Sequence, residues 1–339
     1  MRDNGRETGL KDVARLAGVS VGTVSNVLNH PDKVSADTAR KVLDVIERLG
    51  WVRNDAARQL RQGRSAMLGL VVLDVANPFF TDVAAGVEHV ANANGRVVLL
   101  TNSGEDADRE TRALRLFESQ RLDGLLVAPV GDDVAPLEAV RARGTRVVLI
   151  DRLASSPGFS SVAVDDRLGG RLAIDHLLER GHRHLGFVGA STAIEQVANR
   201  LTGARAGVAG RDGVRLEVFE SQAMNAGAGR SVGEQIAALP AGDRPTAVFA
   251  ANDLLAIGVL QAFLLAGLTV PGDLALIGYD DIQYAASAAV PLSSVRQPAF
   301  EMGRRAAELL IHEIESGGDV VPEQVVFEPR LVVRESTTR

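Results

Sequence analysis

The first thirty residues place apolar side chains at helical spacing on both sides of a glycine. These positions are Val13, Leu16 and Ala17, followed by Val24, Val27 and Leu28. Their i, i+3, i+4 pattern predicts two short amphipathic helices, the second running from Val21 to about Asn29. Gly18 supplies the left-handed turn between them, and Ser20 is a good N-cap for the second helix.

A third helix is predicted to begin near Ser35 and to end at Gly50. Four apolar positions would share its inner face: Ala39, Val42, Ile46 and Leu49. A helix, a tight glycine turn, a second helix and a supporting third helix form the helix-turn-helix arrangement, in which the second helix enters the major groove of DNA. A three-helix bundle without a role in DNA binding is the alternative at this point.

From Leu68 onward, short apolar runs alternate with amphipathic segments. The runs predict strands at Leu68–Leu73, Val97–Thr101, Gly124–Ala128, Val147–Ile150, Leu185–Val188, Thr246–Ala250 and Leu274–Gly278. Helical patterns lie between them, for example at Phe80–Asn92, Asp108–Ser119, Gly169–Arg180 and Leu254–Leu265. This alternation predicts parallel sheets covered by helices on both faces, and the length of this part favours two α/β lobes.

Polar residues follow several of these strands directly. They are found at Asp74–Phe80, Asp151–Arg152, Asn252–Asp253 and Asp280–Asp281. Because ligands of open α/β folds bind beyond the carboxyl ends of the strands, these residues predict a cleft for a small polar ligand. Asn252 or Asp253 could instead cap a helix, and Asp281 could be a turn residue.

The charge of the chain divides unevenly. Residues 1–65 hold 12 Lys and Arg against 8 Asp and Glu, a net charge of +4 in a chain whose formal net charge is −6. The remaining residues therefore hold 25 against 35, a net charge of −10. A small basic region joined to a large acidic one is typical of a nucleic-acid-binding module attached to another domain, although a solvated basic patch would give the same count.

The composition narrows the class of protein further. The chain has 339 residues, of which 46% are hydrophobic, as in soluble globular proteins. No apolar run approaches the roughly 20 residues of a membrane span, and Met1–Leu10 lacks the apolar core of a secretory signal. We therefore expect a cytoplasmic protein with no membrane partner. The absence of cysteine excludes disulfides, thiolate metal sites and cysteine nucleophiles.

No arrangement of residues favours catalysis. Gly229–Gly233 has the G-x-S-x-G spacing, but no hydrophobic strand precedes it, and a helix start is the better interpretation. His182 and His184 lack a third metal ligand. No glycine-rich phosphate cradle opens the first strand-to-helix turn, and the paired aspartates 165–166 and 280–281 would point to opposite faces of a strand. We expect no enzyme, no metal and no cofactor.

The sequence DVARLAGVSVGTVSNVLN, residues 12–29, resembles the DNA-binding head of the LacI family of bacterial transcription regulators. Residues 51–61 continue the resemblance, and the motifs NPFF, NRLTG, FAANDLLAIG and IGYDD extend it through the rest of the chain. The resemblance implies a helix-turn-helix head at 1–52 and a hinge helix with linker at 53–65. It also implies a core similar to periplasmic sugar-binding proteins, with one lobe at 66–166 and 296–323 and the other at 167–295 and 324–339.

The resemblance places the DNA contacts in the head and hinge. The residues implied are Lys11, Ser20, Val21, Gly22, Thr23, Ser25, Asn26, Asn29, Lys33, Asn54, Ala57, Arg58 and Leu60. Val21, Gly22 and Asn26 would face base edges, and Asn26 could pair with adenine. Better-known members carry larger polar side chains at the first two positions. Leu60 would wedge into a base step of the minor groove, and Arg53 replaces the usual proline; linker packing is the alternative role of Leu60.

The strand ends and the resemblance together predict the effector contacts. These are Phe79, Phe80, Asp151, Arg152, Arg200, Met224, Asn252, Asp253 and Asp280. Arg200 would grip a hydroxyl or carboxylate of the ligand, with a surface salt bridge as the alternative. Met224 stands roughly where some members stack an aromatic ring, which favours a sugar over a planar base.

These features predict a homodimeric repressor that binds a palindromic operator in double-stranded DNA and is switched by a sugar or a related metabolite. The proposed switch is a rotation between lobes that changes the spacing of the two hinge segments. A solute receptor without a DNA role is the first alternative, and a sugar-modifying enzyme is the least favoured. The segment after Pro329 has no leucine heptad, which argues against a tetramer held by a C-terminal coiled coil.

Overall fold

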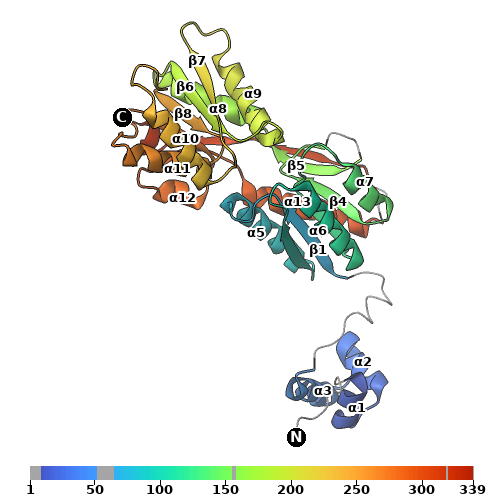
Figure 1. Cartoon of the computed structure of the whole chain (residues 1–339). Coiled ribbons are helices and arrows are strands. Elements are labelled where there is room, and N and C mark those ends of the chain that lie inside the picture. Colours follow the sequence, from blue (N-terminus) through green and yellow to red (C-terminus); the bar gives the residue numbers. More distant parts are fainter. Residues whose placement is uncertain (1–8, 52–64, 155–157, 318–319, 339) are drawn as a thin grey trace. The chain divides into compact units, whose positions relative to one another are not determined.

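A computed structural model of the chain describes residues 9–51, 65–154, 158–317 and 320–338. The chain divides into two compact units, Met1–Arg64 and Ser65–Arg339 (Figure 1). We call the described part of the first unit the head and the second unit the core.

The head is built from three α-helices and one 3-10 turn. Their bounds are α1 Leu10–Ala17, α2 Val21–Asn29, η1 Pro31–Lys33 and α3 Ala36–Leu49. Gly18 and Gly50 end α1 and α3 with φ of 69° and 55°, the left-handed conformation that glycine adopts without strain. Ser20 and Ser35 cap α2 and α3 by accepting hydrogen bonds from the Thr23 and Thr38 amides. Both predicted caps and both glycine ends are confirmed.

The head packs around a small apolar core. Its buried residues are Val13, Ala14, Val24, Val27, Val42 and Val45. The prediction for Leu16 was wrong, because this side chain is 46% exposed. In a helix of eight residues the stripe at positions 13, 16 and 17 lies close to the stripe actually used, and the contacts with α2 and α3 favour the side that bears Ala14.

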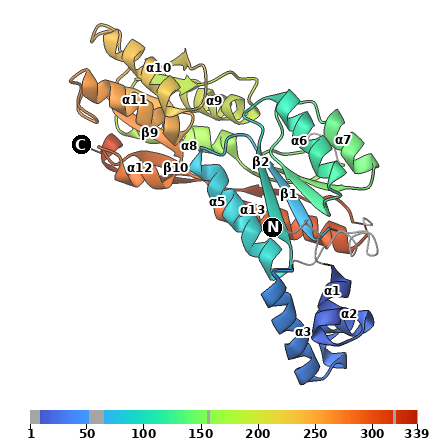
Figure 2. The ribbon, with the colours of Figure 1, turned by 60° about the horizontal axis from the view of Figure 1, so that its bottom comes forward.

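The core contains two six-stranded sheets, one in each lobe (Figures 1 and 2). The first sheet has the order β11-β5-β4-β3-β1-β2, with every pairing parallel. Its strands are β1 Met67–Val72, β2 Val97–Asn102, β3 Gly124–Val127, β4 Arg146–Ile150, β5 Ser160–Val164 and β11 Gln324–Phe327. Its helices are α5 Pro78–Ala93, α6 Ala107–Ser119, α7 Ala135–Ala142 and α13 Ala299–Glu315.

The second sheet has the order β12-β10-β9-β8-β6-β7, in which only the β10–β12 pair is antiparallel. Its strands are β6 His184–Gly189, β7 Arg215–Glu220, β8 Ala247–Ala250, β9 Ala275–Asp280, β10 Ser293–Arg296 and β12 Arg330–Val332. Its helices are α8 Asp166–Glu179, α9 Glu195–Val208, α10 Ala226–Ala238, α11 Asp253–Leu265 and α12 Gln283–Ser287, and η2 Glu335–Thr337 follows β12. Gly229–Gly233 lies inside α10, as the helix interpretation predicts.

Alternate side chains of the first sheet enter two separate cores. Leu70, Val72 and Val148 face the side covered by α5 and α13, whereas Val71 and Leu149 face α6 and α7. This alternation follows from the strand geometry, which directs successive side chains to opposite faces. The second lobe has one contiguous buried cluster that includes residues of all four long helices, α8 to α11. The predicted parallel sheets covered on both faces are therefore confirmed.

The chain crosses between the lobes after β5, after β10 and after β11. The sequence assigned 324–339 entirely to the second lobe, and this boundary was wrong. Gln324–Phe327 forms β11 and pairs in parallel with β5 of the first sheet, so the last crossing follows Phe327. The strand has only four residues with an alternating exposed pattern, which gives little signal in the sequence.

Candidate effector pocket and DNA-binding head

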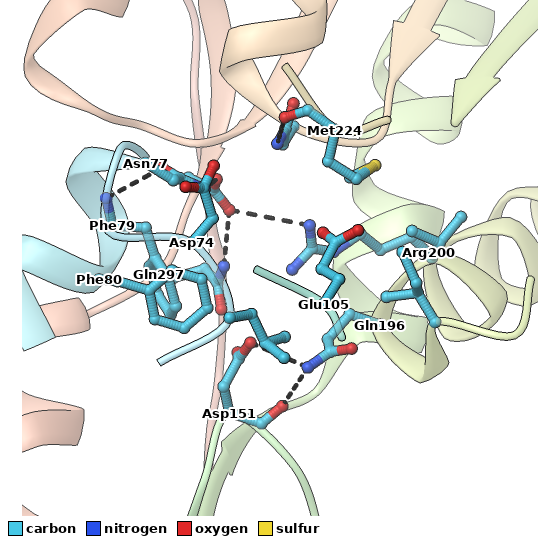
Figure 3. Close-up of a pocket in the computed structure, with 15 residues that line it drawn as sticks. Asp74, Asn77, Phe79, Phe80, Glu105, Asp151, Gln196, Arg200, Met224 and Gln297 are labelled. Atoms are coloured by element: carbon cyan, nitrogen blue, oxygen red, sulfur yellow. Dashed lines mark hydrogen bonds and ion pairs between the residues drawn. The ribbon is translucent and has the colours of Figure 1, made fainter. Parts of the chain in front are cut away.

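A pocket of about 460 Å³, including open space at its mouth, is lined by residues of both lobes (Figure 3). From the first lobe come Leu73, Asp74, Asn77, Phe79, Phe80, Glu105 and Asp151. From the second lobe and the β10–α13 connection come Ile194, Gln196, Val197, Arg200, Met224, Asn252, Asp280 and Gln297.

Two strand ends direct carboxylates into this pocket through unusual backbone. Asp151 follows β4 with φ of 60°, and Asp280 ends β9 with φ of 100°. Non-glycine residues adopt positive φ only at an energetic cost, and such strain is concentrated at binding and active sites. Both side chains are at most 6% exposed. The fold therefore maintains two strained, buried aspartates at the positions where an α/β fold binds its ligand.

Arg200 of α9 is the centre of a buried charge network. Its Nε donates to Asp166 at 2.7 Å, and its Nη1 donates to the Ala251 carbonyl at 2.7 Å and lies 3.8 Å from Asp280. Its guanidinium carbon lies 3.8 Å from the ring centroid of Tyr279. Burial alone would lower the pKa of Arg200, but Asp166 and the other nearby groups raise it, so the arginine stays charged. The surface salt bridge considered from the sequence is excluded, because Arg200 is only 4% exposed.

The carboxylates around Arg200 are held in an environment that disfavours their charge. Burial raises the pKa of Asp280 to about 6, against the opposing effect of Arg200. Burial, together with the nearby Asp166, raises the pKa of Asp151 well above its ordinary value. At the pocket mouth, partial burial and the neighbouring Asp74 raise the pKa of Glu105. The pocket lining thus holds four carboxyl groups and one guanidinium, and burial disfavours the charged form of these three carboxyls.

Two pocket hydrogen bonds join the lobes. Asn77, the N-cap of α5, donates through Nδ2 to Asp280 Oδ2 at 3.2 Å. Gln196 of α9 donates through Nε2 to Asp151, at 2.8 Å from its carbonyl oxygen and 2.9 Å from Oδ2. Because these donors and acceptors belong to opposite lobes, the pocket walls depend on how the lobes are oriented to each other.

Seven of the nine predicted effector residues line the pocket. These are Phe79, Phe80, Asp151, Arg200, Met224, Asn252 and Asp280. Asn252 also caps α11 through the Leu255 amide and donates to the Met224 carbonyl, so the capping alternative and the pocket position both hold. Asp281 lies in the turn between β9 and α12 with φ of 57°, as the turn alternative predicts, and it forms ion pairs with Arg296 at 2.6 Å and with Arg334 at 2.7 Å.

Arg152 and Asp253 do not line this pocket, and their predicted role as effector contacts stays a prediction. Asp253 is fully buried at the start of α11, where Ser294 Oγ donates to it at 2.7 Å and the Ile282 amide at 2.9 Å. These bonds satisfy both oxygens, and the carboxylate ties β10 to the β9–α12 turn. Arg152 pairs with Asp132 and Glu195, each at 2.8 Å.

Sequence reasoning missed two glutamines and a glutamate of the pocket. Gln196 lies in the first turn of α9, and Gln297 follows β10, a strand that the apolar pattern did not predict. Glu105 lies in the β2–α6 connection with φ of 59°. The rule of polar residues at strand ends would have found Gln297 if β10 had been recognised.

In the head, three predicted base-facing residues are exposed on α2. Val21 is 41% exposed, and Gly22 and Asn26 are also exposed. A Cβ on Gly22 would meet only the Ser20 hydroxyl, at 3.6 Å. Ser20 and Thr23 are engaged in the N-cap, Ser25 is partly buried, and Lys11 and Lys33 are exposed on α1 and η1. The first turn of α2 therefore presents a narrow surface with little side-chain bulk.

The remaining predicted DNA contacts are not described by the structure. Asn54, Ala57, Arg58 and Leu60, with the rest of the predicted hinge up to residue 64, lie outside the described residues. For Asn29 the backbone closes α2, but its side chain is outside the description.

Comparison with known proteins agrees with this architecture. Residues 9–54 match the profile of bacterial regulatory proteins of the lacI family, and residues 174–337 match that of the periplasmic binding protein-like domain. The chain is 32% identical over 327 residues to the ribose operon repressor of Haemophilus influenzae, covering 96% of this chain and 98% of that protein. The chain belongs to the LacI family of bacterial regulatory proteins.

Solved structures of the LacI family match nearly the whole chain. The lac repressor dimer bound to operator and the anti-inducer ONPF superposes with a TM-score of 0.82 at 26% identity, covering 98% of this chain and 100% of that one. The complex of the transcriptional regulator CelR with cellobiose has a TM-score of 0.70 at 30% identity, covering 97% and 99%. This LacI-family member is thus a DNA-binding transcriptional regulator and not an enzyme, as the sequence predicts.

Two further findings concern membrane-spanning helices and metal sites. None of the helices in the described ranges is long and apolar enough to cross a membrane. Within the same ranges, no group of three His, Cys, Asp or Glu side chains is arranged to hold a metal ion.

Proposed function

We propose that this LacI-family regulator is a cytoplasmic homodimeric repressor whose operator binding is switched by a sugar in the pocket between its lobes. One observation carries the proposal: a single chain combines an exposed recognition helix with a buried polar pocket whose walls come from two lobes. A receptor without a DNA role would not need α2, and the similarity to repressors over nearly the whole chain argues against an enzyme.

The pocket chemistry supports a sugar as the effector. Arg200, Asp280 and Asn252 offer fixed polar groups for ring hydroxyls. Phe79 and Phe80 form an edge-to-face pair with ring centroids 5.0 Å apart, which offers apolar surface for the C–H face of a sugar ring. The complex of CelR with cellobiose gives independent support, because that neighbour holds a sugar on the same fold.

In this proposal the head residues make two kinds of DNA contact, one to bases and one to phosphates. Asn26 would pair with an adenine and discriminate by about 1–3 kcal/mol, and Val21 would contact a thymine methyl group. Lys11 and Lys33 would contact phosphates, which position the head without specifying sequence. The bare surface at Gly22 would allow the backbone of α2 to approach the bases closely.

The effector would act through the lobe contacts. A sugar that bridges Asp151, Arg200 and Asp280 would favour one relative orientation of the lobes. It can shift the equilibrium only by its differential affinity for the two orientations. The lobe orientation would then set the spacing of the hinge segments of the two subunits, as the family resemblance implies.

A gel shift with DNA from upstream of the regulator's own gene tests the proposal. We expect the full-length protein to retard this DNA at low salt, and a sugar effector to change the retarded fraction. Retention of no DNA at low salt would refute the regulator assignment. Retardation that no sugar changes would leave the DNA function and refute the effector assignment.

Leu60→Ala is the sharpest variant for the hinge proposal. We expect it to lose most of the specific affinity while non-specific binding and the fold of the head persist, because the wedge that kinks the operator is gone. Measured operator affinity equal to that of the unaltered protein would contradict the hinge role. Circular dichroism of the same sample serves as the control for folding.

A further inference from the structure

Two acceptor atoms of the pocket have no donor among the described residues: Asp151 Oδ1 and Gln297 Oε1. Asp151 is 6% exposed and Gln297 is 4% exposed, so both atoms are buried, and both side chains line the pocket (Figure 3). A buried acceptor without a donor is energetically unfavourable and is rare in native proteins. The pocket therefore lacks hydrogen-bond donors at two fixed points.

The orientation of both groups is set by their other atoms. Asp151 Oδ2 accepts from Gln196 Nε2 at 2.9 Å. Gln297 Nε2 donates to Asp280 Oδ1 at 2.7 Å, which assigns the amide nitrogen to that side and leaves the amide oxygen without a partner. Gln297 cannot present a donor to a ligand without losing its bond to Asp280. Asp151, when ionised, offers only acceptors.

The charge of the pocket points in the same direction. Its described lining includes four carboxylates, Asp74, Glu105, Asp151 and Asp280, and a single cation, Arg200. Arg200 is already engaged with Asp166 and the Ala251 carbonyl. Within the described parts of the chain, Asp74 and Glu105 form no ion pair with a basic side chain. The raised pKa of Glu105, caused by partial burial and by Asp74, agrees with an excess of negative charge.

We infer that the effector is a polyhydroxylated molecule, neutral or amine-bearing, that carries no phosphate or carboxylate group. Its hydroxyl or amino hydrogens would satisfy Asp151 Oδ1 and Gln297 Oε1, which an anionic group cannot do because it offers only acceptors. This inference rests on the proposed function and specifies the chemical class of ligand within it. It separates free sugars from sugar phosphates and sugar acids, which the fold alone does not do.

Matched ligand pairs test the inference on the full-length protein. The panel contains D-ribose with D-ribose 5-phosphate, and D-glucose with D-glucose 6-phosphate, D-glucuronate and D-glucosamine, together with D-galactose and cellobiose. A thermal-shift screen finds the ligands, and titration calorimetry measures their affinities. We expect any anionic partner to bind at least tenfold more weakly than its parent sugar, roughly the effect of an unmet buried acceptor.

An anionic partner that binds as tightly as its parent sugar would overturn the inference and leave the proposed function intact. If no compound of the panel binds, the sugar assignment in the proposed function fails, and this inference fails with it. The two failures are therefore distinguishable in one experiment.

Asp151→Asn supplies a second, independent readout. The substitution removes the ionisable carboxyl and replaces the unpaired acceptor with a donor or a swapped amide. We expect the preference for the free sugar over its phosphate ester to shrink at least about threefold, since both the repulsion and the unmet acceptor are reduced. The matched control is Asp212→Asn, the same change on an exposed residue beyond the far end of α9. An equal change in preference for both variants, or for neither, would contradict the role of Asp151.

Discussion

Asp280 is a buried carboxyl group of the pocket whose charged form is disfavoured by its surroundings. Its carboxylate is 6% exposed, has φ of 100° and accepts from Asn77 and Gln297. These bonds and Arg200 favour the charged form, but burial outweighs them and raises the pKa to about 6. A carboxyl with a raised pKa in the folded state is one that the folded state prefers to protonate. Stability should then depend on pH with a definite sign.

We predict that Asp280→Asn changes this pH dependence. Between the unfolded pKa of 3.8 and the folded value of about 6, the folded protein binds more protons, so the contribution of Asp280 to stability falls as pH rises. The stability advantage of the unaltered protein over Asp280→Asn should therefore decrease between pH 4 and pH 7, by at most about 3 kcal/mol. Urea unfolding of both proteins across this pH range measures the difference.

Asp106→Asn is the control with the opposite sign. The backbone amide of Arg109 lowers the pKa of Asp106, so its contribution to stability is lost as pH falls rather than as it rises. A stability difference for Asp280→Asn that grows from pH 4 to pH 7, or stays constant, would contradict the account of the Asp280 environment.

The crossing of α8 and α9 positions Arg200. A Cβ at Gly170 would come within 2.0 Å of the Arg200 carbonyl oxygen, and one at Gly203 within 1.9 Å of the Arg167 carbonyl. The two helices thus approach closely enough that only glycine fits at these contact points. Because Arg200 lies on α9 at this crossing, the packing of two helices determines where the guanidinium stands in the pocket.

Gly170→Ala should therefore damage both stability and effector binding. The added methyl group must push α9 away from α8, and overpacking of this kind costs about 1–3 kcal/mol. We expect a lower melting temperature and weaker binding of any sugar that the matched panel identifies. Gly242→Ala is the control, because a Cβ there meets no atom within 4 Å. Equal behaviour of the two variants would contradict the close crossing.

A second contact between the two lobes, an ion pair, lies beside the pocket. Arg152 of the first lobe, 5% exposed in its side chain, pairs with Glu195 of α9 in the second lobe at 2.8 Å and also contacts Asp132 and the Gly131 carbonyl. Two adjacent residues of the first lobe therefore contact two adjacent residues of α9. Asp151 accepts from Gln196, and Arg152 pairs with Glu195. This geometry makes Arg152 a link between the lobes.

We predict that Glu195→Gln favours a more open arrangement of the lobes. Loss of a partly buried ion pair of about 1 kcal/mol changes the open population about fivefold. Amide hydrogen exchange at the first turn of α9 should accelerate accordingly in the ligand-free protein. Glu118→Gln, which removes the 2.6 Å pair with Arg143 inside the first lobe, is the matched control and should leave that turn unchanged. Exchange at the α9 turn that Glu195→Gln leaves unaltered would argue against the link.

The elements could be predicted from the sequence to the extent that they bury apolar faces. The head helices and the strands β1, β2, β3, β4, β6, β8 and β9 carry the helical or continuous apolar patterns, and they were predicted within a few residues. All of these strands are buried except β2, a largely exposed edge strand with a continuous apolar run. The strands β5, β7, β10, β11 and β12 were not. Of these, β5 and β10 contain buried serines that hydrogen-bond across the fold, and β7 and β11 are partly exposed edges. Their pairing depends on distant partners.

The site shows the same limit. Aspartates directly after predicted strands were found because topology places those positions at one edge. The direction in which the side chains next to these aspartates point could not be predicted. Arg152 and Asp253 have suitable chemistry, but Arg152 pairs with Glu195 and Asp253 accepts from the Ile282 amide. Gln196 could not be predicted for a different reason. It lies at the start of a helix and not after a strand, and only the approach of the lobes brings it to Asp151.

At the scale of the whole molecule, charge is separated along the chain. Residues 1–64 carry 12 basic against 8 acidic side chains, and the core carries 25 against 35. The average of −6 conceals a basic first unit and an acidic core. An acidic core repels the DNA phosphates, so attraction to a duplex is confined to the head and the segment that follows it.

This separation predicts how operator affinity depends on salt. Each phosphate contact contributes about −0.9 to the slope of log K against log salt, so a homodimer with several contacts per head should bind steeply less well as salt rises. Lys33→Gln removes one exposed cation from each head and should make the slope shallower by up to about 2 in the dimer. Arg230→Gln removes an exposed cation from α10 of the core and should leave the slope unchanged. Fluorescence anisotropy with operator DNA at several salt concentrations measures both. A slope that both substitutions change equally would mean that the core contacts DNA, and the acidic surface would then have to be reassigned.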